Sequence, residues 1–286
     1  MQAAPFSDIL VPLDGSPTAE RALRPALELV RRTGVPLRVL RRAFPDEAET
    51  AAAYLADVAD RHSGVTDVET QMVDQDSVPD AIREGLGADT LVCMSSHGRG
   101  GVARALMGSV AESVLRTLDR PVLVVGPHLG ESVTFTGRVV ACLDGSTASE
   151  RTLDPAHAWA ETLGLPLWLI QVAVPGTPVE WMTQGGATGS APLARLAWRL
   201  GDVDGWDTYH SRHPARELAD LAASSYHPTA LLVMATHGRT GWDRLRLGSV
   251  TAATVHAATV PVLVVPGGPP EPVDAAGADH AGAAQP

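Results

Sequence analysis

The chain has 286 residues and a formal net charge of −11, and 45% of its residues are hydrophobic. This length allows one large domain or two smaller ones, each with a buried core. The acidic balance argues against a general nucleic-acid-binding protein, because neutralising phosphates requires clustered positive charge. No apolar run approaches the roughly 20 residues of a membrane helix, and no signal peptide is evident. We therefore expect a cytoplasmic protein without nucleic-acid or membrane partners.

The first half of the chain alternates strand and helix signals. Short apolar or alternating runs typical of strands lie at 8–13, 36–44, 65–73, 89–94 and 120–125. Helical patterns lie between them, at 18–34, 46–64, 78–87 and 109–119. Ser16 is the expected N-cap of the first helix, and Gly34 is its expected end. Strands separated by helices indicate right-handed parallel crossovers, so we predict a doubly wound α/β fold.

The second half of the chain repeats the first. "DILVPLDGSPTAERALRPAL" at 8–27 parallels "RVVACLDGSTASERTLDPAH" at 138–157, and nearly half the positions of 91–125 are identical in 231–265. Such internal repetition indicates two copies of one fold. We therefore predict two tandem α/β domains, each with a five-stranded, Rossmann-like parallel sheet. The expected segments are domain 1 at 1–127, a linker at 126–137, domain 2 at 136–267, a flexible loop at 175–192 and a disordered tail at 268–286.

The two cysteines, Cys93 and Cys142, both lie inside apolar runs. In a cytoplasmic protein such residues are more often buried free thiols than a disulfide. We expect both thiols to be free.

A glycine-rich stretch, "SSHGRGG", follows the strand predicted at 89–94. In open parallel sheets, ligands bind beyond the carboxyl ends of the strands, where the strand order reverses. Gly98, Gly100 and Gly101 allow positive φ and let backbone N–H groups face a ligand. Gly108-Ser109-Val110 then opens a helix, whose unpaired N–H groups and positive dipole end attract anions. The loop and the helix start together provide two donor clusters that suit a polyphosphate.

These motifs resemble the universal stress protein family. Its nucleotide-binding members carry a glycine, two residues, a glycine, nine residues, and then glycine with serine or threonine. Here this frame reads Ser95-Ser96-His97-Gly98 followed by Gly108-Ser109, and Ala235-Thr236-His237-Gly238 followed by Gly248-Ser249. The resemblance covers 8–126 and 138–266 and includes the "LDGS", "HGR", "GSV" and "PVLVV" segments of each half.

The resemblance implies an adenine-nucleotide α-hydrolase-like fold that binds ATP with Mg²⁺ and acts in stress response or signalling. It also implies that the last strands of the two halves pair inside the chain as a pseudo-dimer; a homodimer and a protein partner stay open. The candidate binding residues in the first half are Pro12, Asp14, Ser95, His97, Gly98, Arg99, Gly108, Ser109 and Val110. Those in the second half are Asp144, Val172, Ala235, His237, Gly238, Arg239, Gly248, Ser249 and Val250.

Each candidate also has a purely structural interpretation. Asp14 either lies near the ribose and metal or caps the following helix, and the loop histidines either touch phosphate or bond to their own loop backbone. Arg99 and Arg239 either contact phosphate or pair with nearby acids. Ser109 and Ser249 either bind the ligand or act as plain N-caps. We expect no protein metal site, because no further ligands stand at metal-binding spacing beside the histidines.

Departures from the family frame motivate a second function class. Ser95 and Ala235 stand where the first glycine is expected, and each costs about 1 kcal/mol if that position needs positive φ. Arg42 and Val172 occupy the expected adenine-facing positions, so we expect the second half to bind better. Cys142 replaces a proline of the first half. The alternative is an interaction module without nucleotide binding. We recognise no catalytic constellation and predict no enzyme; slow ATP hydrolysis is a third, weaker alternative.

Overall fold

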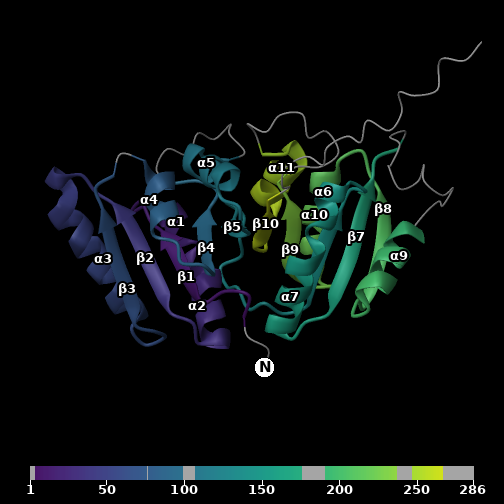
Figure 1. The fold of residues 1–286 in the computed structure, drawn as a ribbon, viewed down its shortest axis with the longest axis horizontal. Helices are drawn as coiled ribbons and strands as arrows, with labels where there is room; N and C mark the ends of the chain where they lie inside the picture. The colour runs from purple at the N-terminus through teal and green to yellow at the C-terminus, as the bar shows by residue number, and fades with distance from the viewer. Residues whose placement is uncertain (1–3, 76, 99–106, 176–190, 237–246, 267–286) are drawn as a thin grey trace, which may run out of the picture.

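The computed structural model describes residues 4–75, 77–98, 107–175, 191–236 and 247–266. The predicted tail at 268–286 and most of the predicted loop at 175–192 lie outside these residues. The described part forms one ten-stranded sheet with the order β3-β2-β1-β4-β5-β10-β9-β6-β7-β8 (Figure 1). We call residues 1–127 unit one and residues 136–267 unit two.

Both units show the predicted alternation of strands and helices. Unit one contains β1 (Asp8–Pro12), α1 (Pro17–Glu20), α2 (Leu23–Thr33), β2 (Leu37–Arg42), a 3₁₀ turn (Pro45–Glu47), α3 (Ala48–His62), β3 (Val68–Val73), α4 (Val78–Glu84), β4 (Thr90–Ser95), α5 (Ser109–Thr117) and β5 (Val122–Val125). Unit two contains β6 (Arg138–Leu143), α6 (Thr147–Glu150), α7 (Leu153–Leu163), β7 (Leu167–Ala173), α9 (Ala191–Leu200), β8 (Gly205–His210), α10 (Pro214–Ala222), β9 (Thr229–Ala235), α11 (Ser249–Ala257) and β10 (Val262–Val265). The predicted fold class, two tandem doubly wound units of five parallel strands, is confirmed.

The prediction of one continuous first helix is wrong, because the structure divides it into α1 and α2. Pro25 explains the break: proline has no N–H to donate to the carbonyl of Arg21, and its ring crowds that carbonyl. The N–H of Arg24 bonds the Arg21 carbonyl instead, at 3.2 Å. Both predicted ends are confirmed, because Ser16 accepts the N–H of Ala19 at 3.1 Å and Gly34 ends α2 with φ +73°.

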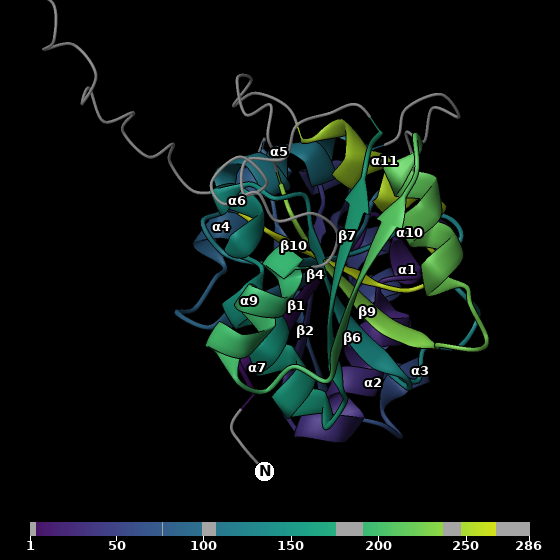
Figure 2. The ribbon, with the colours of Figure 1, turned by 90° about the vertical axis from the view of Figure 1, so that its right-hand side faces the viewer.

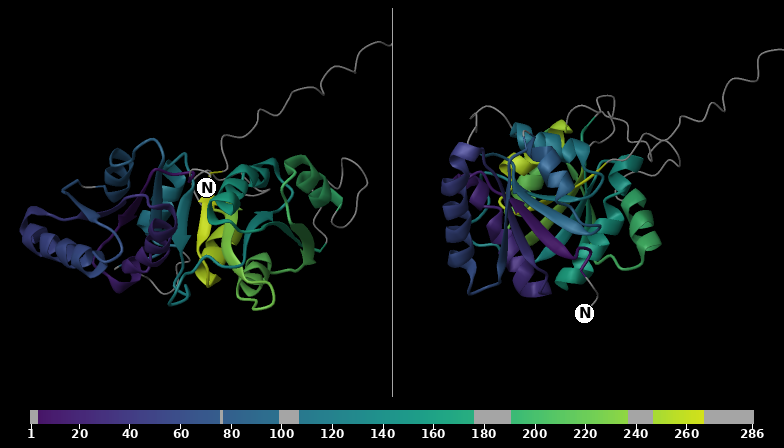
Figure 3. Two further views of the ribbon diagram at one scale, coloured as in Figure 1. Left: turned by 90° about the horizontal axis from the view of Figure 1, so that it is seen from below. Right: turned by 60° about the vertical axis from the view of Figure 1, so that its left-hand side comes forward.

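The two units join through their last strands, which run antiparallel. Val262 lies opposite Val124, and Val264 lies opposite Val122. Both strands are buried along their whole length. This seam is the internal pairing that the resemblance implied, and Figure 3 shows the yellow strand β10 between the two halves. Pairing removes two apolar edges that would otherwise invite aggregation.

Helices cover both faces of the sheet. Buried residues of α1, α2, α3, α7 and α9 pack on one face, and those of α4, α5, α10 and α11 pack on the other. In Figure 2, α7 and α9 lie on one side of the strands of unit two, and α10 and α11 lie on the other. Since each core includes residues from both units, the ten-stranded sheet is covered on both faces by continuous apolar layers.

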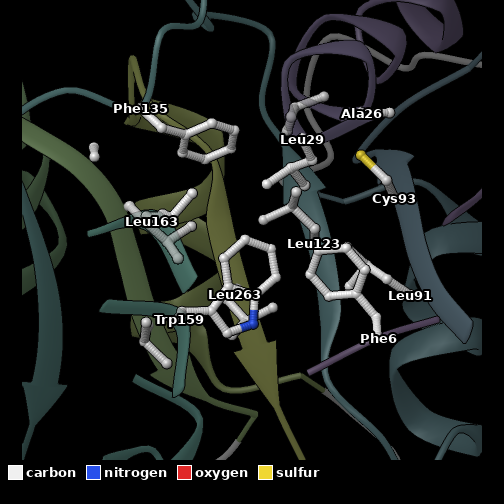
Figure 4. Packing of buried hydrophobic residues seen from close by; sticks show 14 of the residues in the cluster. Phe6, Ala26, Leu29, Leu91, Cys93, Leu123, Phe135, Trp159, Leu163 and Leu263 are labelled. Carbon is white, nitrogen blue, oxygen red and sulfur yellow. The ribbon is translucent and has the colours of Figure 1, made fainter. Parts of the chain in front are cut away.

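Aromatic side chains reinforce the first of these cores at the seam (Figure 4). The ring centroid of Trp159, on α7, lies 5.5 Å from that of Phe6 and 6.5 Å from that of Phe135. Leu123 of β5 and Leu263 of β10 lie opposite one another in the same cluster. Phe6 comes from the start of unit one, so its contact with Trp159 ties the two units together beyond the backbone pairing.

Gly126 follows β5 at a point where the chain passes very close to α11. A Cβ at this position would overlap the backbone carbonyl of Val255. We expect Gly126→Ala to lower the free energy of unfolding by about 1–3 kcal/mol, because backbone atoms must move apart. Gly64→Ala is the matched control, since a Cβ there meets no atom within 4 Å. Urea unfolding of both variants measures the difference, and equal stabilities would show that this approach places no constraint on the seam.

Candidate functional site

The candidate site lies where the strand order of unit one reverses. β1 and β4 are neighbours in the sheet, and the chain leaves their carboxyl ends in opposite directions. A cavity of about 520 Å³ opens at this edge, between the ends of β1, β2 and β4 and the start of α5. Each candidate of unit one that the structure describes lines the cavity: Pro12, Asp14, Ser95, His97, Gly98, Gly108, Ser109 and Val110. Arg99 lies outside the described residues.

Asp14 and Gly98 meet at the floor of this cavity. A Cβ on Gly98 would overlap Oδ2 of Asp14, so any other residue here requires the end of the Asp14 side chain to move. Oδ1 of Asp14 accepts the N–H of Ser16 at 2.9 Å. Asp14 therefore stabilises the turn before α1, whose N-cap is Ser16 and not Asp14, while the same carboxylate also lines the cavity. A partly buried carboxylate oxygen in this position can accept a hydroxyl donor from a ligand.

The start of α5 supplies the donors of the site. Gly108 is the N-cap, and Ser109 and Val110 follow as the first helical residues. The first N–H groups of a helix have no carbonyl partner within it and carry the positive end of its dipole. The amides of Ser109, Val110 and Ala111 belong to this group, and all three residues line the cavity. An anionic group fits this end of the cavity.

Gly108 opens α5, as the sequence predicts, but its own N–H is already used. Its N–H donates to the carbonyl of Ser96 at 2.7 Å, so it closes the loop instead of facing the cavity. A Cβ on Gly108 would lie 3.1 Å from the same carbonyl. Ser109 is not the N-cap either, because Gly108 holds that position. The glycine thus lies where the helix begins, and the residues after it line the cavity.

Ser95 ends β4 in an extended conformation and pairs with Val125 of β5. Ala235 ends β9 in the same way, opposite Val265. The first frame position therefore needs no positive φ, and the expected cost of replacing glycine does not arise from the backbone. Ser95 still lines the cavity, with its Oγ accepting the N–H of His97 at a long 3.4 Å.

The mouth of the cavity contains an aromatic side chain that the sequence analysis missed. Phe44 follows β2 and is 43% exposed. The guanidinium of Arg42 lies 4.0 Å above its ring centroid, and Nε of Arg42 donates to the carbonyl of Gln75 at 2.8 Å. Arg42 therefore stacks on Phe44 while it lines the cavity, and Leu40 and Met94 add apolar side chains to the lining.

The matching region of unit two is described only in part. His237, Gly238 and Arg239 lie outside the described residues. Oδ1 of Asp144 accepts both the N–H and the hydroxyl of Ser146, at 3.1 and 2.6 Å.

The start of α11 repeats that of α5. Gly248 is again the N-cap and donates to the carbonyl of Thr236 at 2.7 Å, followed by Ser249 and Val250. Val172 is half-buried in β7. The loop closure and the helix start are thus shared by both units.

Titratable and metal-binding groups add little chemistry here. Among the residues that the structure describes, no group of three or more His, Cys, Asp or Glu side chains is placed to hold a metal ion. Both cysteines are free and buried, as predicted. Burial raises the pKa of Cys142 to about 12 and raises that of Cys93 as well, so neither thiol is a ready nucleophile.

The contact between Gly98 and Asp14 can be tested by a double-mutant cycle. We expect Gly98→Ala to lower the free energy of unfolding by about 1 kcal/mol, because its Cβ displaces the end of the Asp14 side chain from its preferred position. In an Asp14→Ala background the same change should cost much less, since the overlapping atoms are gone. Urea unfolding of the four proteins measures the coupling. A penalty that is the same in both backgrounds would rule out this contact as the reason for the glycine.

Comparison with known proteins places these features in a family. The family model "Universal stress protein family" matches residues 5–126 and again 136–266. A universal stress protein of Mycobacterium tuberculosis is 32% identical over 208 residues, which cover 69% of this chain and 68% of that protein. One of Mycolicibacterium smegmatis is 31% identical over 230 residues, covering 76% of this chain and 74% of that protein.

Solved structures agree with the fold. The crystal structure of a universal stress protein from Archaeoglobus fulgidus superposes with a TM-score of 0.67 at 18% identity, covering 92% of this chain and 97% of that one.

Within the described ranges, none of the helices combines the length and the apolar character needed to cross a bilayer. With two matches that together span nearly the whole described chain, this protein belongs to the universal stress protein family, as a member with two tandem domains.

Proposed function

We propose that the chain binds ATP, accompanied by Mg²⁺, in the cavity of unit one and acts in stress response or signalling as a binding protein without catalytic turnover. The observation that carries the proposal is the convergence of the α5 amides, the Gly98 backbone and the Asp14 carboxylate on one cavity. Its volume of about 520 Å³ lies in the range of small-molecule sites. We also propose that the two domains span 1–127 and 136–267 and that the protein is cytoplasmic.

The chemistry of the lining suggests how the parts of ATP would be distributed. The amides of Ser109, Val110 and Ala111 suit the phosphates, because they offer unpaired donors at the positive end of a helix. The carboxylate of Asp14 suits ribose hydroxyls, which are hydrogen-bond donors. Leu40, Met94 and the ring of Phe44 offer an apolar and aromatic surface for a base.

The ligand and its metal fit this chain in different ways. Because the described residues hold no group that could bind a metal ion by itself, Mg²⁺ would arrive on the phosphates. Because a Cβ on Gly98 would overlap Asp14, glycine leaves the space beside this carboxylate free of a side chain. We also predict that the matching site of unit two binds, and that it binds more strongly than unit one. This prediction rests on Val172, which stands where unit one has Arg42.

A matched pair of substitutions tests the proposal. Ser109→Asp places a negative charge at the first position of α5, where it favours the helix but repels phosphate. Ser249→Asp makes the same change at the start of α11. By titration calorimetry with Mg-ATP, we expect Ser109→Asp to weaken binding at the unit-one site about tenfold or more, without lowering the melting temperature.

The outcomes distinguish the two sites and the rival function. If only Ser249→Asp reduces binding, the nucleotide occupies unit two. If millimolar Mg-ATP gives neither heat nor thermal stabilisation in the unaltered chain, the nucleotide proposal fails. The interaction-module alternative would then stand, and the exposure of Trp198, at 90%, on α9 is the observation that favours it. Tryptophan is enriched in protein–protein contact surfaces, where its large apolar ring is buried by a partner.

A further inference from the structure

Three histidines from different parts of the chain meet beside the seam. His97 follows β4, His128 lies in the linker after β5, and His256 lies in the last turn of α11. The ring centroid of His256 lies 6.1 Å from that of His97 and 5.6 Å from that of His128, both in edge-to-face geometry. His256 belongs to unit two, whereas His97 lines the cavity of unit one. We call these three side chains the histidine cluster.

Backbone contacts hold the histidine cluster in place. At Gly126 the chain approaches the carbonyls of Val255 and His256 so closely that a Cβ would not fit. The linker beyond it is tied down from both units: Gly130 donates to the carbonyl of Thr259 at 3.1 Å, and Arg24 donates to the carbonyl of Gly130 at 2.9 Å. The separation of His256 from His97 of unit one and from His128 of the linker is therefore set by the seam.

His256 sits in an environment that opposes a proton. Burial lowers its pKa, and the charges that His128 and His97 carry when protonated lower it further. Its Nδ1 is buried and has no hydrogen-bond partner within the described residues. No other charged residue lies on α11. The charged and titratable groups facing it from the neighbouring helix side line the groove of about 720 Å³ between α10 and α11: Arg212, His213, Arg216 and Asp220.

A polyanion in the cavity of unit one would change this balance. His97 lines that cavity, and its Nδ1 lies 3.0 Å from the hydroxyl of Ser96, next to the carbonyl that closes the loop. Phosphates bound at the start of α5 would place several negative charges near His97 and, one ring further, near His256. At such distances, in a partly buried site, unit charges still interact by about 1 kcal/mol or more.

We propose, building on the proposed function, that nucleotide binding in the cavity of unit one is coupled to proton uptake by the histidine cluster, with His256 of unit two as the residue that gains the proton. Burial and the two neighbouring imidazoles disfavour the protonated form of His256. The negative charge of the polyphosphate offsets this effect. No bond is made or broken in this step; one proton passes from solvent to the imidazole. The affinity for Mg-ATP therefore rises as the pH falls toward and below 6.5, the ordinary pKa of histidine.

Titration calorimetry of the full chain in two buffers of different ionisation enthalpy measures the protons taken up with Mg-ATP. At pH near 6.5 we expect the unaltered chain to take up more protons than His256→Gln, by up to about one per ATP. Between pH 7.5 and 6, affinity should rise about threefold more in the unaltered chain than in this variant. The ionisation of the ligand itself cancels in this comparison. His62→Gln is the matched control, because burial also lowers the pKa of His62 but on α3, away from the seam.

Proton NMR of the histidine rings gives a readout that does not depend on affinity. The ring resonance that is absent from the spectrum of His256→Gln belongs to His256. Its pKa should lie below the usual range of histidine in the free chain and should rise with saturating Mg-ATP. His128→Gln should raise the pKa of His256 without any ligand, because one like charge is removed.

The outcomes separate this inference from the function on which it rests. Equal proton uptake by the unaltered chain and His256→Gln, or a His256 resonance that Mg-ATP leaves unmoved while binding heat is seen, overturns the coupling and leaves the nucleotide site standing. Absence of binding heat in every protein overturns both. A larger uptake in the unaltered chain and in His62→Gln than in His256→Gln supports the coupling.

Discussion

The antiparallel pairing of β5 with β10 is the contact on which the rest of this structure depends. Each strand is buried on both sides and would present an apolar edge without the other. Because the pair runs antiparallel, the end of α11 in unit two comes to lie against Gly126 and the residues after β5 in unit one. One backbone interaction therefore joins the sheets, joins the two cores and brings His256 beside the cavity of unit one.

Within unit one, close approach of backbone to side chain shapes the site. Gly98 lies so close to Asp14 that a Cβ would overlap the carboxylate, and the bond from Gly108 to Ser96 lies at the point where α5 begins. Together they leave a cavity bounded by helix amides on one side and by Leu40, Met94 and Phe44 on the other. The chain has a net charge of −11, but the start of α5 carries the positive end of a helix dipole, so a field that favours an anion is present locally and comes from the backbone.

Much of this could be predicted from the sequence, because the signals are local or repeated. Short-range rules predict the order of strands and helices, the N-cap at Ser16 and the end of α2 at Gly34. The division of the first helix at Pro25 was missed, although a proline inside a helical pattern signals it. Three contacts could not be predicted: the bond from the Gly108 amide to the Ser96 carbonyl, the stacking of Arg42 on Phe44, and the proximity of His97 and His256. Each depends on how segments distant in sequence are placed in space.

The account rests on a site at the start of α5 that is physically connected to unit two through the seam. Amide hydrogen exchange of the full chain, with and without saturating Mg-ATP, tests this most directly. We expect slower exchange at 94–98 and 107–112 and, across the seam, at the end of α11 around Val255 and His256. Protection confined to unit two, or no change at the start of α5 under conditions where the nucleotide is bound, would contradict the account.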